Sequence, residues 1–297
     1  MTAPTVQVSD VREQSLTTML AESAPRTASY ARKRCSGCDW YHGAWQYLRA
    51  LGLVSSPAWH REFYGGALSD AFKEASPSRP RVLISGTADF SMVEQVWHSK
   101  ASSGATKPIS MRSIGVDVKV IDRCPTPLKA CQQYAKSVGG RIRVENFDLM
   151  TAKAKPASCD IITTDAFLTR FTANQMANII AAWHSLLDRR GRVVTTVRMH
   201  GEDDDRPDAE ADIRNFTARA LDRLTQWPLP SPPDREWLRN AADSYARRMQ
   251  SSDVGGENSV IKAFTNGGFE ILHREVAAVE GELFPVSYLR IAARRLT

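Results

Sequence analysis

The feature that most constrains the fold is an alternation of apolar, strand-like runs and helical segments that begins at Arg81. The first run, Arg81–Ser85, stops at Gly86, and a short polar turn leads into a helix predicted from about Ser91. Further apolar runs follow at 116–121, 141–144, 160–164 and 192–197, with helices predicted between most of them. Strands that alternate with helices at this spacing predict a mostly parallel sheet.

The pattern changes after the fifth run. An acidic stretch is followed by two predicted helices, at 213–227 and 235–249, and this segment is longer than an ordinary connection. A last predicted helix precedes two strands, at 269–274 and 286–293. We therefore expect a doubly wound α/β fold with a mostly parallel seven-stranded sheet, a C-terminal antiparallel hairpin and a helical insertion after strand five.

The chain before the first strand has a different character. Residues 1–30 are polar and predict a leader with one short helix at about 11–20, whereas 39–72 is aromatic with apolar residues at helical spacing. The expected segments are an N-terminal helical lid at 1–78, a strand–helix core at 79–200, the insertion as a substrate cap at 201–256, and a C-terminal helix and hairpin at 257–297.

Composition narrows the class of protein. No apolar run approaches the ~20 residues that span a bilayer, and the polar N-terminus lacks a signal-peptide core, so we expect a cytoplasmic protein without membrane contacts. Five cysteines are too few and uneven for a disulfide framework. The net charge is +6, but the arginines are scattered, which is more typical of a solvated surface than of a nucleic-acid footprint.

Parallel strand–helix units closed by a C-terminal hairpin resemble the class I S-adenosylmethionine-dependent methyltransferases, over about residues 80–200 and 257–297. In that family the first strand leads into a glycine-rich turn that lets the cofactor approach closely. The segment VLISGTADF keeps Gly86, but Ala88 and Phe90 stand where further glycines are usual. Ile84 occupies the usual position of an acidic residue, and we expect Asp89 to bind the cofactor ammonium instead.

The resemblance also implies two carboxylates at strand ends. Asp122 ends the second strand, where the family binds both ribose hydroxyls; the alternative is that it caps the next helix. Asp148 follows the third strand, where the adenine amine is bound, and Phe147 or Leu149 would pack on the ring. The cofactor-binding residues implied in this way are Gly86, Thr87, Ala88, Asp89, Asp122, Arg123, Asp148, Leu149 and Thr164.

Methyl transfer from a sulfonium is an in-line displacement that requires positioning, exclusion of water and removal of an acceptor proton. The expected catalytic candidates are Asp165, directly after the fourth strand, His200, after the fifth strand, and the pair Tyr41 and His42 in the aromatic segment. The alternatives are a solvent-exposed loop histidine for His200 and helix–helix packing for the aromatic residues. The remaining histidines are interpreted as surface or structural residues.

Cys35 and Cys38 form a C-x-x-C pair, which is half of a zinc site. No second Cys/His pair follows at finger spacing, so we expect two reduced thiols and no metal.

These patterns predict an S-adenosylmethionine-dependent methyltransferase for a small-molecule acceptor, with a place in specialised metabolism. The segment TTDAFLTRF after the fourth strand lacks the Pro-Pro-aromatic sequence of amino-methylating nucleic-acid enzymes, so nucleic acid is not the expected acceptor. Two rivals stay open: a nicotinamide-dependent oxidoreductase, and a non-catalytic or nucleic-acid-binding protein on the same fold. A homodimer in which the aromatic segment covers the partner's site also stays open.

Overall fold

The computed structural model describes residues 8–75, 79–102, 115–151, 157–199, 209–248, 254, 256–279 and 286–297. The chain divides into two compact units. The sheet unit comprises Trp59–Arg206, Gln250–Glu280 and Pro285–Thr297, and the helical unit comprises Met1–Ala58, Pro207–Met249 and Gly281–Phe284.

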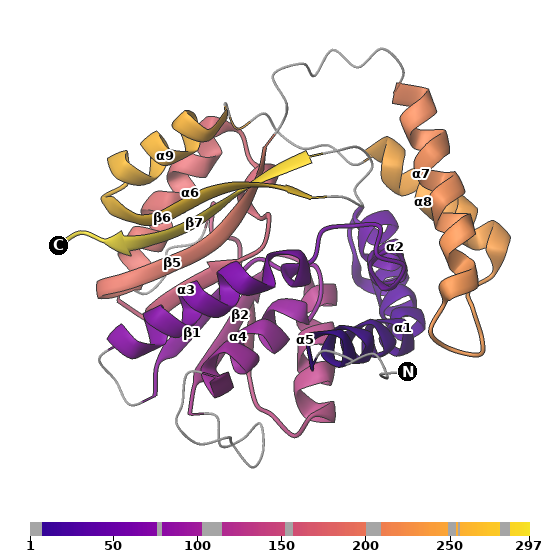
Figure 1. Ribbon diagram of the computed structural model, residues 1–297, viewed down its shortest axis with the longest axis horizontal. Helices are drawn as coiled ribbons and strands as arrows, with labels where there is room; N and C mark the ends of the chain where they lie inside the picture. The colour runs from indigo at the N-terminus through magenta and orange to yellow at the C-terminus, as the bar shows by residue number, and fades with distance from the viewer. Residues whose placement is uncertain are drawn as a thin grey trace, which may run out of the picture. The chain divides into compact units, whose positions relative to one another are not determined.

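The sheet unit contains one seven-stranded sheet with the strand order β3-β2-β1-β4-β5-β7-β6 (Figure 1). Its strands are β1 (Arg81–Ser85), β2 (Asp117–Asp122), β3 (Arg143–Asn146), β4 (Cys159–Thr164), β5 (Leu187–Met199), β6 (Phe269–Val279) and β7 (Val286–Arg295). Strands β1 to β5 pair in parallel, and β7 runs antiparallel between β5 and β6. The predicted mixed sheet with a C-terminal antiparallel hairpin is therefore confirmed.

Helices cover both faces of this sheet. They are α3 (Arg61–Glu74), α4 (Ser91–Ser102), α5 (Pro125–Ser137), α6 (Ala173–Leu186) and α9 (Gly256–Asn266), with short 3-10 helices η1 (Pro57–His60) and η3 (Leu168–Arg170). Successive residues of a strand point to opposite faces. Thr163 of β4 donates from its hydroxyl to Met92 of α4, whereas its neighbour Ile162 packs in the cluster that contains α6 and α9. Helices α4 and α6 therefore lie on opposite faces.

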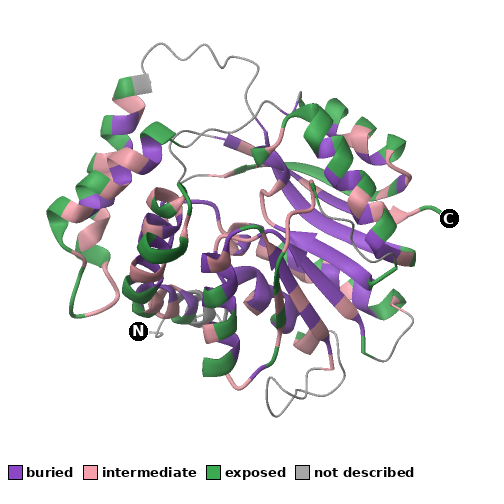
Figure 2. Ribbon diagram, turned by 180° about the vertical axis from the view of Figure 1, so that it is seen from behind, coloured by how far each residue is buried: buried purple, intermediate pink, exposed green. Residues whose placement is uncertain are grey.

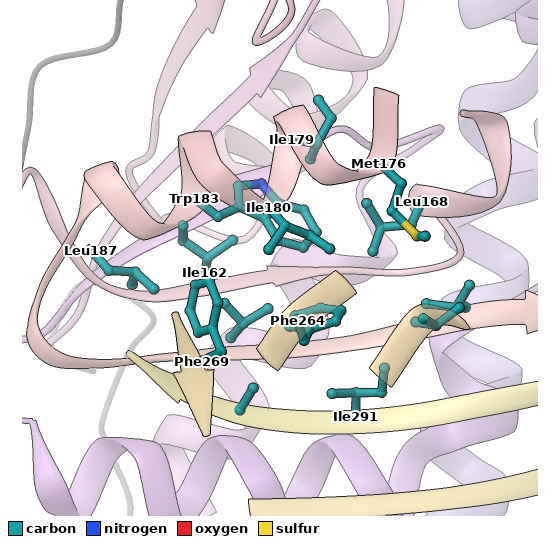
Figure 3. Close-up of a cluster of buried hydrophobic side chains, with 14 of the residues drawn as sticks. Ile162, Leu168, Met176, Ile179, Ile180, Trp183, Leu187, Phe264, Phe269 and Ile291 are labelled. Atoms are coloured by element: carbon teal, nitrogen blue, oxygen red, sulfur yellow. The ribbon is translucent and has the colours of Figure 1, made fainter. Parts of the chain in front are cut away.

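An apolar cluster lies between the sheet and helices α6 and α9. Figure 3 shows Trp183 and Ile180 of α6 directed toward Ile162, with Phe264 and Phe269 on the other side of that residue. The central strands β1, β4 and β5 are buried along most of their length, whereas the edge strands β3 and β6 are largely exposed (Figure 2). The Trp183 indole N–H donates to Ser85 Oγ over 2.9 Å inside this core, which ties α6 to the carboxyl end of β1.

The helical unit is built from α1 (Val8–Arg34), α2 (Asp39–Ala50), α7 (Ala209–Arg223) and α8 (Arg235–Arg248), with the 3-10 helix η4 (Leu224–Gln226). Helix α1 is far longer than the predicted 11–20 and continues through Pro25. It carries buried alanines three and four residues apart, at Ala21, Ala24, Ala28 and Ala31. Because these side chains lie on one face, α2 packs closely along α1 and stabilises a helix that its proline would weaken.

Aromatic side chains join the N-terminal segment to the insertion. The Tyr41 ring stacks on Tyr245 of α8 with centroids 6.0 Å apart, and Tyr47 stacks on Trp227 at 5.7 Å. The predicted lid and the predicted insertion therefore share one helical unit. Helix α3, which we expected to belong to the lid, is part of the sheet unit instead and packs on α4 and β5.

Among the described residues, no helix is long and apolar enough to cross a membrane.

Candidate functional site

The turn after β1 requires glycine at position 86. Gly86 has a left-handed backbone with φ of +76°, and a Cβ atom there would overlap the ring of Phe167. Its N–H donates to the Ile121 carbonyl of β2 over 2.8 Å, and its own carbonyl accepts from the Thr164 hydroxyl at the end of β4. The predicted glycine turn is thus held at the carboxyl ends of three neighbouring strands.

The carboxylate of Asp122 lies against this turn. The backbone N–H of Thr87 donates to Asp122 Oδ2 over 3.1 Å, and the N–H of Cys124 donates to Oδ1 over 2.7 Å. Burial raises the pKa of Asp122 to about 6, although these two N–H groups and Arg123 oppose the shift. The second of these bonds closes a turn before Cys124, which is itself the N-cap residue of α5, so the alternative role of Asp122 as the helix cap is not observed. The first bond is directed at the glycine turn.

The loop after β3 lies beside Asp122. The Phe147 N–H and the Asn146 side-chain amide both donate to the Asp122 carbonyl oxygen over 3.0 Å. Asp148 accepts from the Met150 N–H over 2.9 Å, and its charge adds to the raised pKa of Asp122. Leu149 is half-buried against the core. The structure therefore brings the predicted ribose and adenine positions together at one edge of the sheet.

The Asp89 side chain is buried, whereas a residue that binds a cofactor ammonium would be accessible to the ligand. Its side chain is 2% exposed, and Oδ1 accepts from the Ser91 N–H over 2.7 Å, where α4 begins. The Thr87 hydroxyl donates to the Asp89 carbonyl over 2.6 Å, which closes the turn around the half-buried Ala88. Asp89 thus shapes the turn and starts α4, and its contact with a cofactor ammonium stays a prediction. Arg123 is exposed.

Asp165 belongs to a buried polar network that the sequence did not reveal. Thr196 of β5 donates from Oγ1 to Asp165 Oδ1 over 2.8 Å and accepts from the Ala166 N–H over 3.0 Å. The Tyr64 hydroxyl of α3 donates to the Thr164 carbonyl over 2.8 Å and lies 3.2 Å from Asp165 Oδ1. Burial, followed by the Asp165 charge, raises the pKa of Tyr64 well above its usual value, so Tyr64 is a neutral donor.

His60 lies close to the same network. We expected a surface or structural residue at this position, and the structure shows a deeply buried one. Its side chain is 1% exposed, and Arg290 donates from Nε to His60 Nδ1 over 3.2 Å. Burial lowers the pKa of His60, and the nearby Asp165 charge partly opposes this shift. Because Nδ1 accepts a hydrogen bond from a cation, the imidazole is neutral with its proton on Nε2.

The other three predicted catalytic residues are His200, Tyr41 and His42. His200 lies outside the described residues. Tyr41 and His42 belong to the helical unit, where the Tyr41 ring is surrounded by Trp40, Trp45 and Tyr245. Among the described residues of the sheet unit, Asp165 is the predicted catalytic residue at the sheet edge, and the roles of Tyr41, His42 and His200 stay predictions.

No family model matches the chain, and no curated protein does. Solved structures similar to it include an S-adenosylmethionine-dependent methyltransferase from Methanosarcina mazei, with 13% identity over 75% of this chain and 96% of the other and a TM-score of 0.49. The N-methyltransferase NodS from Bradyrhizobium japonicum WM9, in complex with S-adenosylhomocysteine, has 14% identity over 93% and 98%, with a TM-score of 0.49. Magnesium protoporphyrin IX methyltransferase from Synechocystis PCC 6803 has 13% identity over 84% and 86%, with a TM-score of 0.48.

The strand order decides the fold, because five parallel strands are closed by an antiparallel β7 that lies between β5 and β6. The fold is that of the class I S-adenosylmethionine-dependent methyltransferases. In open α/β sheets, ligands bind outside the carboxyl ends of the strands. The class I methyltransferase fold of this chain places Gly86, Asp122, Asp148 and Asp165 at that edge.

Proposed function

We propose that this protein is an S-adenosylmethionine-dependent methyltransferase. The observation that carries the proposal is the Asp122 carboxylate, which is linked through Oδ2 to the Thr87 N–H of the glycine turn. An acidic group at this position faces the turn that follows β1 and is suited to a ribose.

The donor set around Asp122 fits the two vicinal hydroxyls of an adenosyl ribose. Each carboxylate oxygen has two acceptor positions, and each accepts one backbone N–H, from Thr87 and from Cys124. One acceptor position on each oxygen thus remains for a hydroxyl donor. Since the carboxylate is held by two backbone groups, it is oriented before the ribose binds, which lowers the entropic cost of binding.

Three further groups of residues would complete the cofactor site. Gly86 and Thr87 would line the path of the amino-acid end, and the Phe167 ring fills the space that a side chain at position 86 would occupy. Asp148 would accept from the adenine amine, and Leu149 would pack on the ring. Bound S-adenosylmethionine supplies an electrophilic methyl group on a sulfonium.

Asp165 is the general base that we propose for the acceptor proton. Thr196 and Tyr64 both approach its Oδ1 atom, so they fix the orientation of the carboxylate. A half-buried, oriented carboxylate beside the transferred group is suited to removing a proton as the new bond forms.

The acceptor that we propose is a small molecule. The segment at 163–171, which begins with the last two residues of β4, reads TTDAFLTRF and carries no Pro-Pro-aromatic sequence. The proposal also includes a role in specialised metabolism, a cytoplasmic location, and the lid and cap roles of the helical segments. A homodimer stays an open alternative.

Calorimetric titration of the full-length protein with S-adenosylmethionine, S-adenosylhomocysteine and NAD tests the proposal. We expect binding of the first two ligands, at least tenfold weaker binding in Asp122→Ala, and unchanged binding in Asp117→Ala. Asp117 is a matched control because it lies at the opposite end of β2 and pairs with Arg143. Binding of NAD alone would support the oxidoreductase, and no binding of any of the three would contradict a cofactor site. Formation of S-adenosylhomocysteine on addition of small-molecule acceptors then tests transfer itself.

A further inference from the structure

The corner between α1 and α2 brings three metal-ligating side chains together within the helical unit. They are Cys35, Cys38 and His42, and their ligand atoms all lie within 4.8 Å of one another. Cys35 Sγ lies 3.6 Å from His42 Nδ1. We propose that these three residues bind a zinc ion.

The backbone explains why the three side chains converge. Helix α1 ends at Arg34, and the N–H of Cys35 still donates to the Ala31 carbonyl over 2.8 Å. Gly37 then takes a left-handed conformation with φ of +85°, which reverses the chain within the C-x-x-C pair. Cys38 directly precedes α2, and the His42 N–H donates to the Cys38 carbonyl over 3.0 Å. Residues four apart share a helix face, so His42 lies above Cys38.

The observed spacing suits tetrahedral zinc. Zn–S bonds of about 2.3 Å and Zn–N bonds of about 2.0–2.1 Å, at a tetrahedral angle, place sulfur and nitrogen about 3.5–3.6 Å apart. The distance between Cys35 Sγ and His42 Nδ1 is 3.6 Å. Two thiolates and one imidazole are also the donor types that select zinc over magnesium or calcium.

The surroundings favour thiolates, the form in which cysteine binds metal. Arg32, Lys33 and Arg34 form the last turn of α1, immediately before Cys35. Cys38 lies at the start of α2, where the helix dipole and the first N–H groups stabilise a negative charge. Both cysteines are present as half-buried thiols, whereas the His42 side chain is 8% exposed. A metal therefore has access to the sulfurs, and the imidazole is fixed by packing.

Sequence spacing indicated only the two cysteines of this site, because the third ligand lies inside a helix. The motif is C-x-x-C-x-x-x-H, in which the histidine follows one helical turn after the second cysteine. Three protein ligands leave one tetrahedral position for a water molecule or another donor. Zinc on Nδ1 would also prevent this nitrogen from accepting a proton, so His42 would be a zinc ligand and not the general base.

Metal analysis of the untagged full-length protein, purified without chelators, tests the zinc site. We expect about one zinc ion per chain, lost by about tenfold or more in Cys35→Ser, Cys38→Ser and His42→Ala. Matched controls are Cys131→Ser and Cys159→Ser, which alter buried thiols of the sheet unit and should keep the zinc. Because ligand variants of this kind sometimes unfold, circular dichroism accompanies each measurement.

Cobalt substitution of the wild-type protein gives an independent readout. Tetrahedral thiolate ligation predicts intense visible ligand-field bands and near-ultraviolet sulfur-to-cobalt charge-transfer bands. Wild-type protein with no more zinc than the double variant Cys35→Ser/Cys38→Ser, or cobalt spectra without thiolate bands, would show that the 3.6 Å contact is only a thiol–imidazole hydrogen bond. Iron in place of zinc would overturn the choice of metal. The zinc site is independent of the proposed cofactor site. The Asp122→Ala variant, which should lose cofactor binding, should therefore retain its zinc.

Discussion

The backbone N–H of Thr87 donates to the carboxylate of Asp122 over 3.1 Å, joining the glycine turn after β1 to the end of β2. These two residues are far apart in the chain, and the parallel pairing of Ser85 with Ile121 brings them together. The carboxylate is therefore part of the turn that it faces, and changes at either position should affect the same binding site.

Cofactor affinity should depend on the ionisation of Asp122. Burial raises its pKa to about 6 in the free protein, and only the ionised carboxylate accepts from both ribose hydroxyls without donating. Affinity should therefore rise with pH and level off above 7, and it should be about tenfold weaker at pH 5 than at pH 7. Titration with S-adenosylhomocysteine across this range checks the profile. An unchanged pH dependence in Asp122→Asn would show that another group titrates.

Replacement of Gly86 by alanine should destabilise the protein and weaken cofactor binding. The left-handed backbone costs about 1–2 kcal/mol for a residue with a Cβ, and overlap with the Phe167 ring adds about 1–3 kcal/mol. Chemical denaturation measures the loss. Adding Phe167→Ala to Gly86→Ala should remove the overlap contribution and leave the backbone cost. Equal effects of Gly86→Ala in both backgrounds would contradict the packing that we describe.

Tyr64 and Thr196 should act as a coupled pair on Asp165. Tyr64→Phe removes a buried hydroxyl donor, at a cost of about 1–2 kcal/mol. Thr196→Val removes the acceptor of the Ala166 N–H as well as a donor to Asp165, and it should cost about 1–3 kcal/mol. A double-mutant cycle by denaturation should give a coupling energy of about 0.5 kcal/mol or more. Strict additivity would mean that the hydroxyls act independently.

The Arg81–Asp160 pair provides a test of stability without an effect on binding. Arg81 donates its backbone N–H and two N–H groups of its guanidinium, from Nε and Nη2, to the Asp160 carboxylate at the amino ends of β1 and β4. Asp160→Asn should lower the free energy of unfolding by about 1–3 kcal/mol, since Arg81 remains partly hydrated. Below its unfolding temperature, the variant should bind S-adenosylhomocysteine as the wild type does. If Asp160→Asn bound S-adenosylhomocysteine more weakly than the wild type, the weaker binding of Asp122→Ala would reflect a loss of stability as well as a lost contact.

The sequence predicted the strands of the sheet well, because each is a short apolar run that ends in a turn. It also placed Gly86, Asp122 and Asp148 at strand ends, and parallel pairing then puts them at one edge. The contact between Tyr64 and Thr196 was not predictable in this way, since it joins a helix to a strand 132 residues later. The buried state of His60 likewise depends on Arg290 of β7.

Two local features were also missed for physical reasons. The length of α1 depends on the packing of its alanine face on α2, which overrides the proline at position 25. Strand β5 begins at Leu187 and not at 192, because Leu187 pairs with Cys159 before the register shifts. Tertiary pairing thus extends the strand across Gly191 to the residue that follows α6.

The most direct test of the central claim is a binding cycle between Asp122 and the ribose. It compares S-adenosylhomocysteine with its 2′,3′-dideoxy analogue, in the wild type and in Asp122→Ala. Two hydrogen bonds to a charged acceptor predict that the wild type binds the analogue about 100-fold more weakly. The variant should bind both ligands with similar affinity. A wild-type protein that does not distinguish the two ligands, or a variant that still does, would contradict the assignment of Asp122 as the ribose-binding residue.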